Sequence, residues 1–215
     1  MNDSASKPSK VTRIEIDGDI ATIIFNRPEK RNAMNDALID ELDAFFSAPP
    51  KSVTAVILRG EGGHFCSGLD LAEHEHRAPV EGVFHSRNWH RVSELIEFGG
   101  LPVISVLTGA VIGGGLEIAA STHVRIAEPT VRFQLPEGRR GIFVGGGATV
   151  RVGRLLGPDR MREMMLTGRT IMADEALAMG CINEVVPHDE LMERTMVWVN
   201  QILACSPLSL RASKD

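Results

Sequence analysis

Apolar residues stand among polar ones in residues 11–16 and dominate residues 20–25, two short stretches near the start of the chain. Short stretches rich in Val, Ile, Thr and Phe are typical of β-strands, and the intervening Asp17-Gly18-Asp19 is typical of a tight turn. In residues 36–47 the apolar positions recur at helical spacing instead, and one face carries Leu38, Ile39, Leu42, Phe45 and Phe46. The pattern predicts a β-hairpin followed by an amphipathic helix.

Strands and helices continue to alternate along the chain. Residues 53–59 predict a strand, and residues 101–127 predict an apolar strand, a glycine turn, a short helix of small residues and a second strand. Residues 83–98 predict a helix whose inward face includes Trp89 and Val92. This alternation indicates an α/β protein.

The sequence predicts one domain over residues 1–215, with a mainly helical C-terminal part at 158–215. A chain of this length can bury a sizeable core, and its 43% hydrophobic content is ordinary. Residues 1–10 are polar, are expected to be flexible, and resemble neither a secretory nor an organelle signal. With no apolar run of membrane-spanning length, the sequence predicts a cytoplasmic protein without a membrane partner.

The charge of the chain and its cysteines and histidines argue against nucleic-acid binding and metal binding. A formal net charge of −5 and the lack of a long basic run predict no nucleic-acid partner. Cys66, Cys181 and Cys205 are an odd number without metal or redox spacing, so buried thiols are expected. No HExxH pattern or Cys/His set accompanies the nearby histidines, so no metal site is expected at His74, His76, His85 and His90.

Two glutamates give the strongest chemical indication in the chain. Glu117 follows Gly113-Gly114-Gly115, Glu137 follows Pro136, and each stands in apolar or glycine-rich sequence. Apolar surroundings favour the neutral form of a carboxyl group, and two carboxyl groups in one pocket titrate apart, so one can be acid and the other base. Taken singly, either glutamate is more often a solvated surface residue or the partner of an arginine.

Glycine-rich turns add candidate backbone donors. The turn at residues 113–115 precedes the helix that carries Glu117, and a second turn at residues 60–71 follows a predicted strand. Glycine lets a backbone come close to a ligand, and the free N–H groups at a helix start suit an anion or a developing oxyanion. Neither turn fits a dinucleotide or phosphate-loop motif.

Four sequence blocks together resemble the crotonase (enoyl-CoA hydratase/isomerase) family. The first is NRPEKRNAMN at residues 26–35, and FCSGLDL at 65–71 is similar to the family's F-x-x-G-x-D turn. GGGLE at 113–117 and PE at 136–137 resemble the other two blocks, and the order and spacing of all four agree. The resemblance implies a crotonase-like spiral of ββα units with a helical C-terminal region.

The resemblance also implies roles for particular residues. The amides of Leu69 and Gly114 would form an oxyanion hole for a coenzyme A thioester. Glu117 would orient and deprotonate a water, while Glu137 would exchange a proton at the α-carbon of a 2-enoyl-CoA. Further substrate contacts are implied for Lys30, Arg31, Ala33, Ser67, Gly68, Asp70, Leu71 and Gly113.

Coenzyme A enters as part of the substrate, so no separate cofactor is implied. The likeness further implies a homotrimer or a dimer of trimers, with exposed apolar residues of the helices in 158–205 at the interface. Lys30 and Arg31 would meet the coenzyme A phosphates, unless they are simply exposed loop residues.

The chain departs from the family pattern in three places. One is Thr108, which stands where relatives often carry a longer polar residue. After Glu137 it reads GRRGIFVGGG, where many relatives have apolar residues and then a proline, so Arg139 or Arg140 could pair with a substrate charge, with Glu137, with another subunit or with solvent. Relatives continue through further helices beyond the segment matching 206–215, so the C-terminal part is expected to be incomplete. Thioester hydrolysis, isomerisation and non-catalytic binding of an acyl-CoA or a protein stay open as alternatives to hydration.

Overall fold

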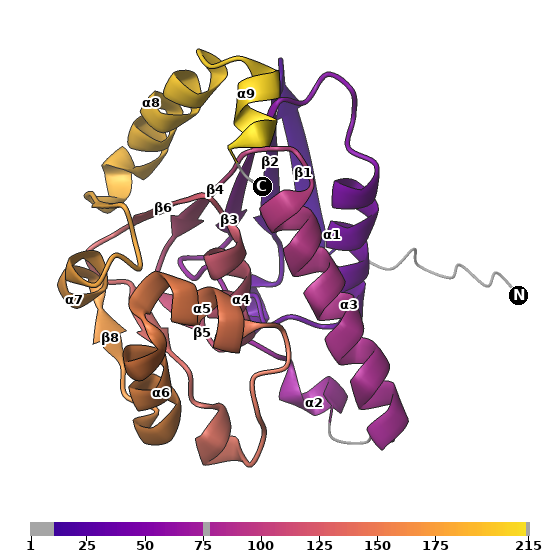
Figure 1. Cartoon of the computed structure of the whole chain (residues 1–215), viewed down its shortest axis with the longest axis vertical. Coiled ribbons are helices and arrows are strands. Elements are labelled where there is room, and N and C mark those ends of the chain that lie inside the picture. The colour runs from indigo at the N-terminus through magenta and orange to yellow at the C-terminus, as the bar shows by residue number, and fades with distance from the viewer. Residues whose placement is uncertain (1–10, 75–77, 214–215) are drawn as a thin grey trace, which may run out of the picture.

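The computed structural model describes residues 11–74 and 78–213. In this part of the chain the larger sheet has six strands in the order β1-β2-β3-β4-β6-β9; β1 and β2 pair antiparallel and the other neighbours pair parallel. The predicted hairpin is confirmed (Figure 1). The strands are β1 (Thr12–Asp17), β2 (Ile20–Phe25), β3 (Ala55–Gly60), β4 (Val103–Leu107), β6 (Val124–Ala127) and β9 (Glu184–Val185).

A smaller sheet joins β5 (Ala110–Ile112), β7 (Arg132–Gln134) and β8 (Ile171–Met172) in the order β5-β7-β8. The single apolar strand predicted ahead of the glycine turn is in fact divided near Gly109 into β4 and β5, which belong to different sheets. Strand β5 leads into α4 (Gly114–Ser121), and its neighbour β7 leads toward Glu137. The small sheet therefore brings the two predicted glutamate segments together.

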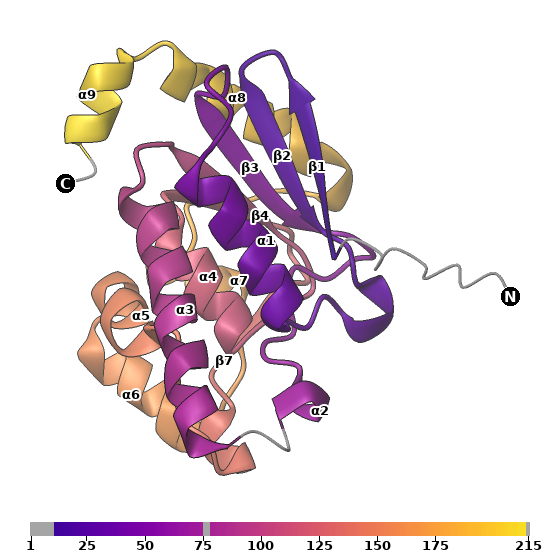
Figure 2. The same ribbon diagram turned by 90° about the vertical axis from the view of Figure 1, so that its right-hand side faces the viewer.

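Helices cover both faces of the larger sheet. Figure 2 shows α1 (Asp36–Ser47) and α3 (Pro79–Phe98) on one face, while α8 (Leu191–Leu203) packs on the other. The period of two in β3 explains this double packing, because Val56 and Leu58 belong to the core beneath α1 and α3, while Ala55 and Ile57 belong to the core beneath α8.

The first long helix follows directly from its sequence. The side chain of Asn35 caps α1 by accepting a hydrogen bond from the Leu38 N–H at 3.1 Å. The five apolar residues predicted on its inner face are buried, which confirms both the bounds and the orientation of the helix. Helix α3 begins at Pro79, earlier than the predicted range 83–98, and it buries Trp89 and Val92 as expected.

The C-terminal part is mainly helical, as predicted, but the short strands β8 and β9 interrupt it. The remaining helices are α2 (Leu71–His74), α5 (Ala148–Leu156), α6 (Pro158–Thr167), α7 (Ala173–Ala178) and α9 (Pro207–Ala212), with 3-10 turns η1 (Pro28–Lys30), η2 (Glu137–Arg140) and η3 (His188–Glu190). Every helix in the described segments is too short or too polar to span a bilayer.

Cys66 and Cys181 are buried, but the expectation of a buried thiol is wrong for Cys205, which lies exposed just after α8. The predicted flexible segment 1–10 and His76 lie outside the described residues.

Candidate active site

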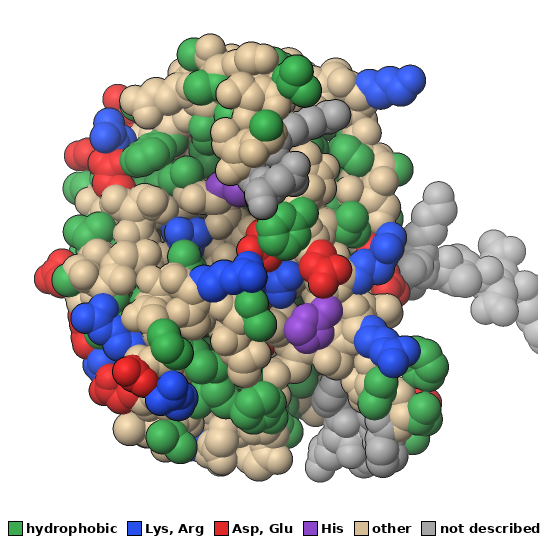
Figure 3. Space-filling view, viewed as in Figure 1, with side chains coloured by type: hydrophobic (Ala, Val, Ile, Leu, Met, Phe, Trp, Pro, Cys, Tyr) green, Lys and Arg blue, Asp and Glu red, His purple; other side chains and the backbone are tan. Residues whose placement is uncertain are grey.

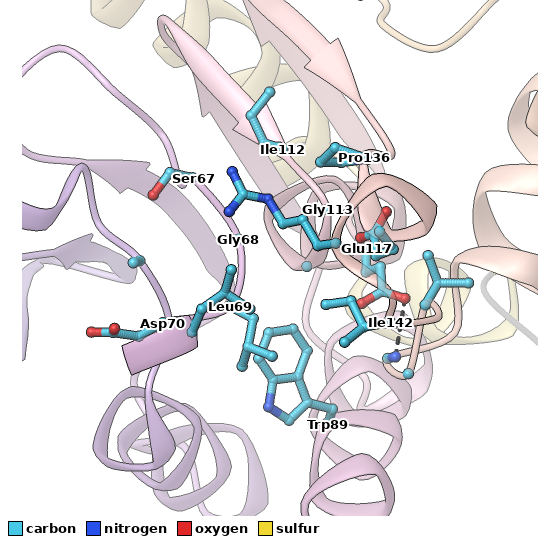
Figure 4. A pocket seen from close by; sticks show the side chains of 18 of the residues that line it. Ser67, Gly68, Leu69, Asp70, Trp89, Ile112, Gly113, Glu117, Pro136 and Ile142 are labelled. Atoms are coloured by element: carbon cyan, nitrogen blue, oxygen red, sulfur yellow. Dashed lines mark hydrogen bonds between the residues drawn. The ribbon is translucent and has the colours of Figure 1, made fainter. Parts of the chain in front are cut away.

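A cavity of about 630 Å³ opens between the loop that precedes α2, the helix α3, the start of α4 and the segment around η2 (Figure 4). Lys30 is the exception among the predicted site residues, because it does not line this cavity; its carbonyl instead accepts a hydrogen bond from the Ser67 hydroxyl at 3.2 Å. The predicted residues on the cavity wall are Arg31, Ala33, Ser67, Gly68, Leu69, Asp70, Leu71, Gly113, Gly114, Glu117 and Glu137.

Backbone pairing brings the two glycine-rich turns together. Met34 donates its N–H to the Gly68 carbonyl and accepts from the Asp70 N–H, both at 2.8 Å. Successive N–H groups of an extended chain point to opposite sides, so the amide of Leu69 points away from Met34. A methyl group on Gly68 would lie 3.6 Å from the Gly114 nitrogen, which places the start of α4 close to this turn.

The amides of Leu69 and Gly114 belong to two adjoining turns of the cavity wall. Neither N–H donates to another group among the described residues. Gly114 is the first residue of α4, where N–H groups have no intrahelical acceptor and the helix dipole favours negative charge. Two unpaired donors at adjoining turns on one cavity wall can bind an oxygen that gains charge.

Glu117 is held in the wall by backbone groups of a distant loop. It stands in the first turn of α4, and only 2% of its surface is exposed. Its Oε1 accepts hydrogen bonds from the N–H groups of Gly146 and Ala148, each at 3.0 Å. Burial raises the pKa of Glu117, while the amides of Ala148 and Gly146 act in the opposite direction. Sequence reasoning did not assign this loop to the site, although its glycine run at 145–147 is visible in the sequence.

Glu137 faces the glycine turn from the other side of the cavity. Gly113 lies at φ 52°, a left-handed conformation that suits glycine, and a methyl group on it would lie 2.6 Å from Glu137 Oε1. Burial raises the pKa of Glu137 to about 7, and the charge of Glu117 adds to the rise. Its Oε2 is buried and has no partner among the described residues. A proton can therefore enter and leave Glu137 near neutral pH.

Charged side chains close to the cavity differ in their partners. The carboxylate of Asp70 accepts from Arg27 at 2.8 Å and points away from Glu117 (Figure 4), so Asp70 shapes the loop rather than reaching the cavity centre. Arg139 donates to the Thr167 carbonyl at 2.5 Å, outside the cavity lining, whereas Arg140 lines the cavity. The two adjacent arginines thus have different surroundings.

Apolar side chains that sequence reasoning did not assign to the site complete the wall. Trp89, expected only as an inward core residue, lines the cavity, and so do three residues after η2: Ile142, Phe143 and Val144. Together with Leu69 and Leu71 they leave most of the wall apolar around the two carboxyl groups. Such a cavity suits an acyl chain whose polar end reaches the two amides.

The family model described as enoyl-CoA hydratase/isomerase matches residues 15–215. The chain belongs to the enoyl-CoA hydratase/isomerase family. The predicted family and the mixed α/β crotonase fold are thereby confirmed.

Individual relatives are similar over most of their length. The chain is 35% identical to the short-chain-enoyl-CoA hydratase of Clostridium acetobutylicum over 94% of this chain and 78% of that protein. It is 33% identical to the crotonyl-CoA hydratase of Syntrophomonas wolfei, with 94% and 78% covered. A solved Thermobifida fusca structure in complex with acetoacetyl-CoA is 28% identical, with a TM-score of 0.87 over 95% of this chain and 85% of that chain.

Proposed function

We propose that this protein adds water across the 2,3 double bond of a 2-enoyl-CoA thioester. The observation that carries the proposal is the presence of two buried carboxyl groups, Glu117 and Glu137, in one cavity with the unpaired amides of Leu69 and Gly114. The relatives named as hydratases support the same reaction. The Thermobifida fusca complex supports a coenzyme A thioester as the bound molecule.

In this mechanism the thioester oxygen accepts hydrogen bonds from Leu69 and Gly114. Glu117 takes a proton from water as the water oxygen bonds to the β-carbon, and the double-bond electrons move onto the thioester oxygen. Glu137 then gives a proton to the α-carbon as the carbonyl reforms, so that H and OH are added in total. Loss of one hole donor typically costs ~100- to 1,000-fold in rate.

The assignment of the two proton transfers follows the environments of the carboxyl groups. Two amides donate to Glu117, and such hydrogen bonds favour the charged form that a base needs. Glu137 has a pKa of about 7, which leaves a large protonated fraction available for donation at neutral pH.

The test is the loss of enoyl-thioester absorbance with crotonyl-CoA and with a panel of longer, branched and aromatic enoyl-CoAs. Formation of the 3-hydroxyacyl-CoA supports hydration. Release of a free thiol, detected with a thiol reagent, would identify a hydrolase, and conversion of 3-enoyl-CoA to 2-enoyl-CoA without hydration would identify an isomerase. Binding without turnover of any thioester would identify a non-catalytic subunit. Each of these three results contradicts the proposal.

A homotrimer or a dimer of trimers is part of the same proposal. Helices α6 and α8 expose apolar side chains, and Leu166 of α6 is 85% exposed. Isologous or cyclic contacts between copies would cover such residues.

A further inference from the structure

One edge of the Trp89 ring contacts both glycine segments of the candidate site. A methyl group on Gly114 would collide with Cζ3 and Cη2 of the ring. A methyl group on Gly146 would lie 2.8 Å from Cε3 of the same ring and 2.5 Å from Oε2 of Glu117. Gly114 carries the proposed oxyanion amide, and Gly146 carries an amide that holds Glu117. A single rigid side chain therefore lies against two backbone groups that the proposed reaction needs.

Packing, rather than a hydrogen bond, holds this ring in place. Trp89 is 3% exposed, and its Nε1 is buried without a hydrogen-bond partner among the described residues. Figure 4 shows the indole nitrogen on the side away from Glu117, so the apolar six-membered ring is the part that meets the glycines. An indole N–H that is buried usually finds an acceptor, so the position of Trp89 is set at some energetic expense.

We propose that Trp89 is a positioning residue, which fixes the Gly114 amide and the Gly146 amide relative to each other and so aligns the oxyanion hole with Glu117. The inference rests on the proposed function and deepens it. Its physical reason is that an oxyanion donor and a general base act only when both are held within a fraction of an ångström of the reacting atoms. Without the ring, the glycine segments on either side of it gain room to move independently.

The first test compares Trp89→Phe and Trp89→Leu with Val92→Ala. The Trp89 variants remove the ring edge that meets the glycines, whereas Val92 is a fully buried residue of the same helix and outside the cavity lining. We expect kcat to fall on the order of 100-fold in the Trp89 variants, as for an ångström-scale misplacement, with little change in KM. Val92→Ala should lose stability but keep kcat. Wild-type kcat in a folded Trp89 variant, or an equal loss in Val92→Ala, would overturn the proposal.

The pH dependence of the rate separates positioning from general loosening of the core. The Gly146 amide lowers the pKa of Glu117, so its displacement should raise that pKa and move the acid limb of the kcat profile to higher pH. The charged groups that act on Glu117, Glu137 of η2 and Arg151 of α5, are unchanged in the variant. His85 of α3 and Arg140 of η2, which also line the cavity, are unchanged as well. An acid limb that stays in place in Trp89→Leu overturns the link to Glu117.

A size exchange tests the contact itself. Gly114→Ala keeps the N–H and the helical backbone, yet its methyl group meets the Trp89 ring, so we expect a large loss of kcat. Adding Trp89→Leu removes the obstruction, and the double variant should be faster than Gly114→Ala alone. A double variant that is no faster contradicts the proposal.

The positioning role of Trp89 and the hydration reaction can be tested independently of each other. If the wild-type protein hydrates no enoyl-CoA, the proposed function fails. The hole can still be probed with acetoacetyl-CoA, whose enolate absorbance should rise on binding to the wild-type protein and rise less with Trp89→Leu. Equal enolate absorbance in both proteins overturns the positioning role whatever the reaction is.

Discussion

At the scale of single residues, burial and charge act on Glu137 in the same direction. Burial disfavours its charged form, and the neighbouring Glu117 adds to that effect, which together raise its pKa to about 7. Glu117 is more deeply buried, but two amide hydrogen bonds oppose the rise of its pKa. The same residue type is thus given two different environments, as acid and base roles require.

We expect Glu117→Gln and Glu137→Gln each to lower the hydration rate by roughly 100- to 10,000-fold, the usual contribution of a positioned acid or base. Glutamine keeps the volume of the side chain while removing its proton-transfer group, so the fold should survive. The measurement is the absorbance decay of crotonyl-CoA, with circular dichroism as the control for folding. A wild-type rate in either variant would be incompatible with the mechanism.

The raised pKa of Glu137 also predicts how stability depends on pH. The ordinary pKa is 4.5 and the folded-state pKa is about 7, so the folded chain holds more protons between these values than the unfolded chain. The free energy of unfolding therefore falls as pH rises through this window because of Glu137. Glu137→Gln should gain stability relative to the wild type between pH 5 and pH 8 in urea titrations. A wild-type-to-variant difference that is equal at both pH values contradicts this.

At the scale of secondary-structure elements, the sequence pattern predicted the longer elements, whose structure is determined by their own residues. Helix α1 has a clear period of its own, and the β1–β2 hairpin has two β-rich stretches around a local Asp-Gly-Asp turn. Strands β8 and β9 have two residues each, too few for a period, and are defined by pairing with β7 and β6. The break at Gly109 was hidden because β4 and β5 are both apolar and buried.

The candidate site shows the same division between local and distant information. Glu117, Glu137 and the two glycine turns were predicted from motifs, since each motif is continuous in the sequence. The hydrogen bonds that position Glu117 were not predicted, because the Gly146 amide that donates to Glu117 lies 29 residues away. Trp89 reads as an ordinary core residue of α3, and only tertiary packing places its ring against Gly114.

The buried carboxylate of Glu128 links two parts of the fold, the break between β4 and β5 and the turn η3. It accepts hydrogen bonds from the Gly109 N–H and the Thr130 hydroxyl, both at 2.8 Å, and from His188 of η3 at 2.5 Å. Burial alone would raise the pKa of Glu128, but these donors together lower it. The carboxylate therefore joins the β4–β5 break to the turn that begins α8.

We expect Glu128→Ala to lower the free energy of unfolding by about 2 kcal/mol, since buried donors lose their acceptor. The nearby Asp189→Ala, an exposed change in η3, should have little effect. Urea denaturation of both variants at neutral pH is the measurement. The stabilisation from Glu128 should also be lost as pH falls through its lowered pKa, so the two proteins should converge in acid. Equal stability of Glu128→Ala and wild type at neutral pH would contradict the role.

At the scale of the whole molecule, the surface carries both charged and apolar exposed side chains. Figure 3 shows positive and negative side chains next to each other across the middle of one face, in keeping with a formal net charge of only −5 for 215 residues. Exposed apolar side chains are spread over several elements, and they include Leu166 of α6 and Met192 and Val197 of α8. Exposed apolar side chains favour contact with another protein surface.

The last prediction concerns assembly. We expect the protein to sediment as a trimer or a dimer of trimers, because a side chain as apolar and as exposed as Leu166 gains free energy when a second copy covers it. Leu166→Glu places a charge at that position and should shift the population toward monomer, with circular dichroism unchanged. Ile16→Glu makes the same chemical change at a 49% exposed residue of β1, away from α6 and α8, and should leave the assembly intact. A monomeric wild-type protein would exclude the assembly, and a trimeric Leu166→Glu variant would move the interface away from α6.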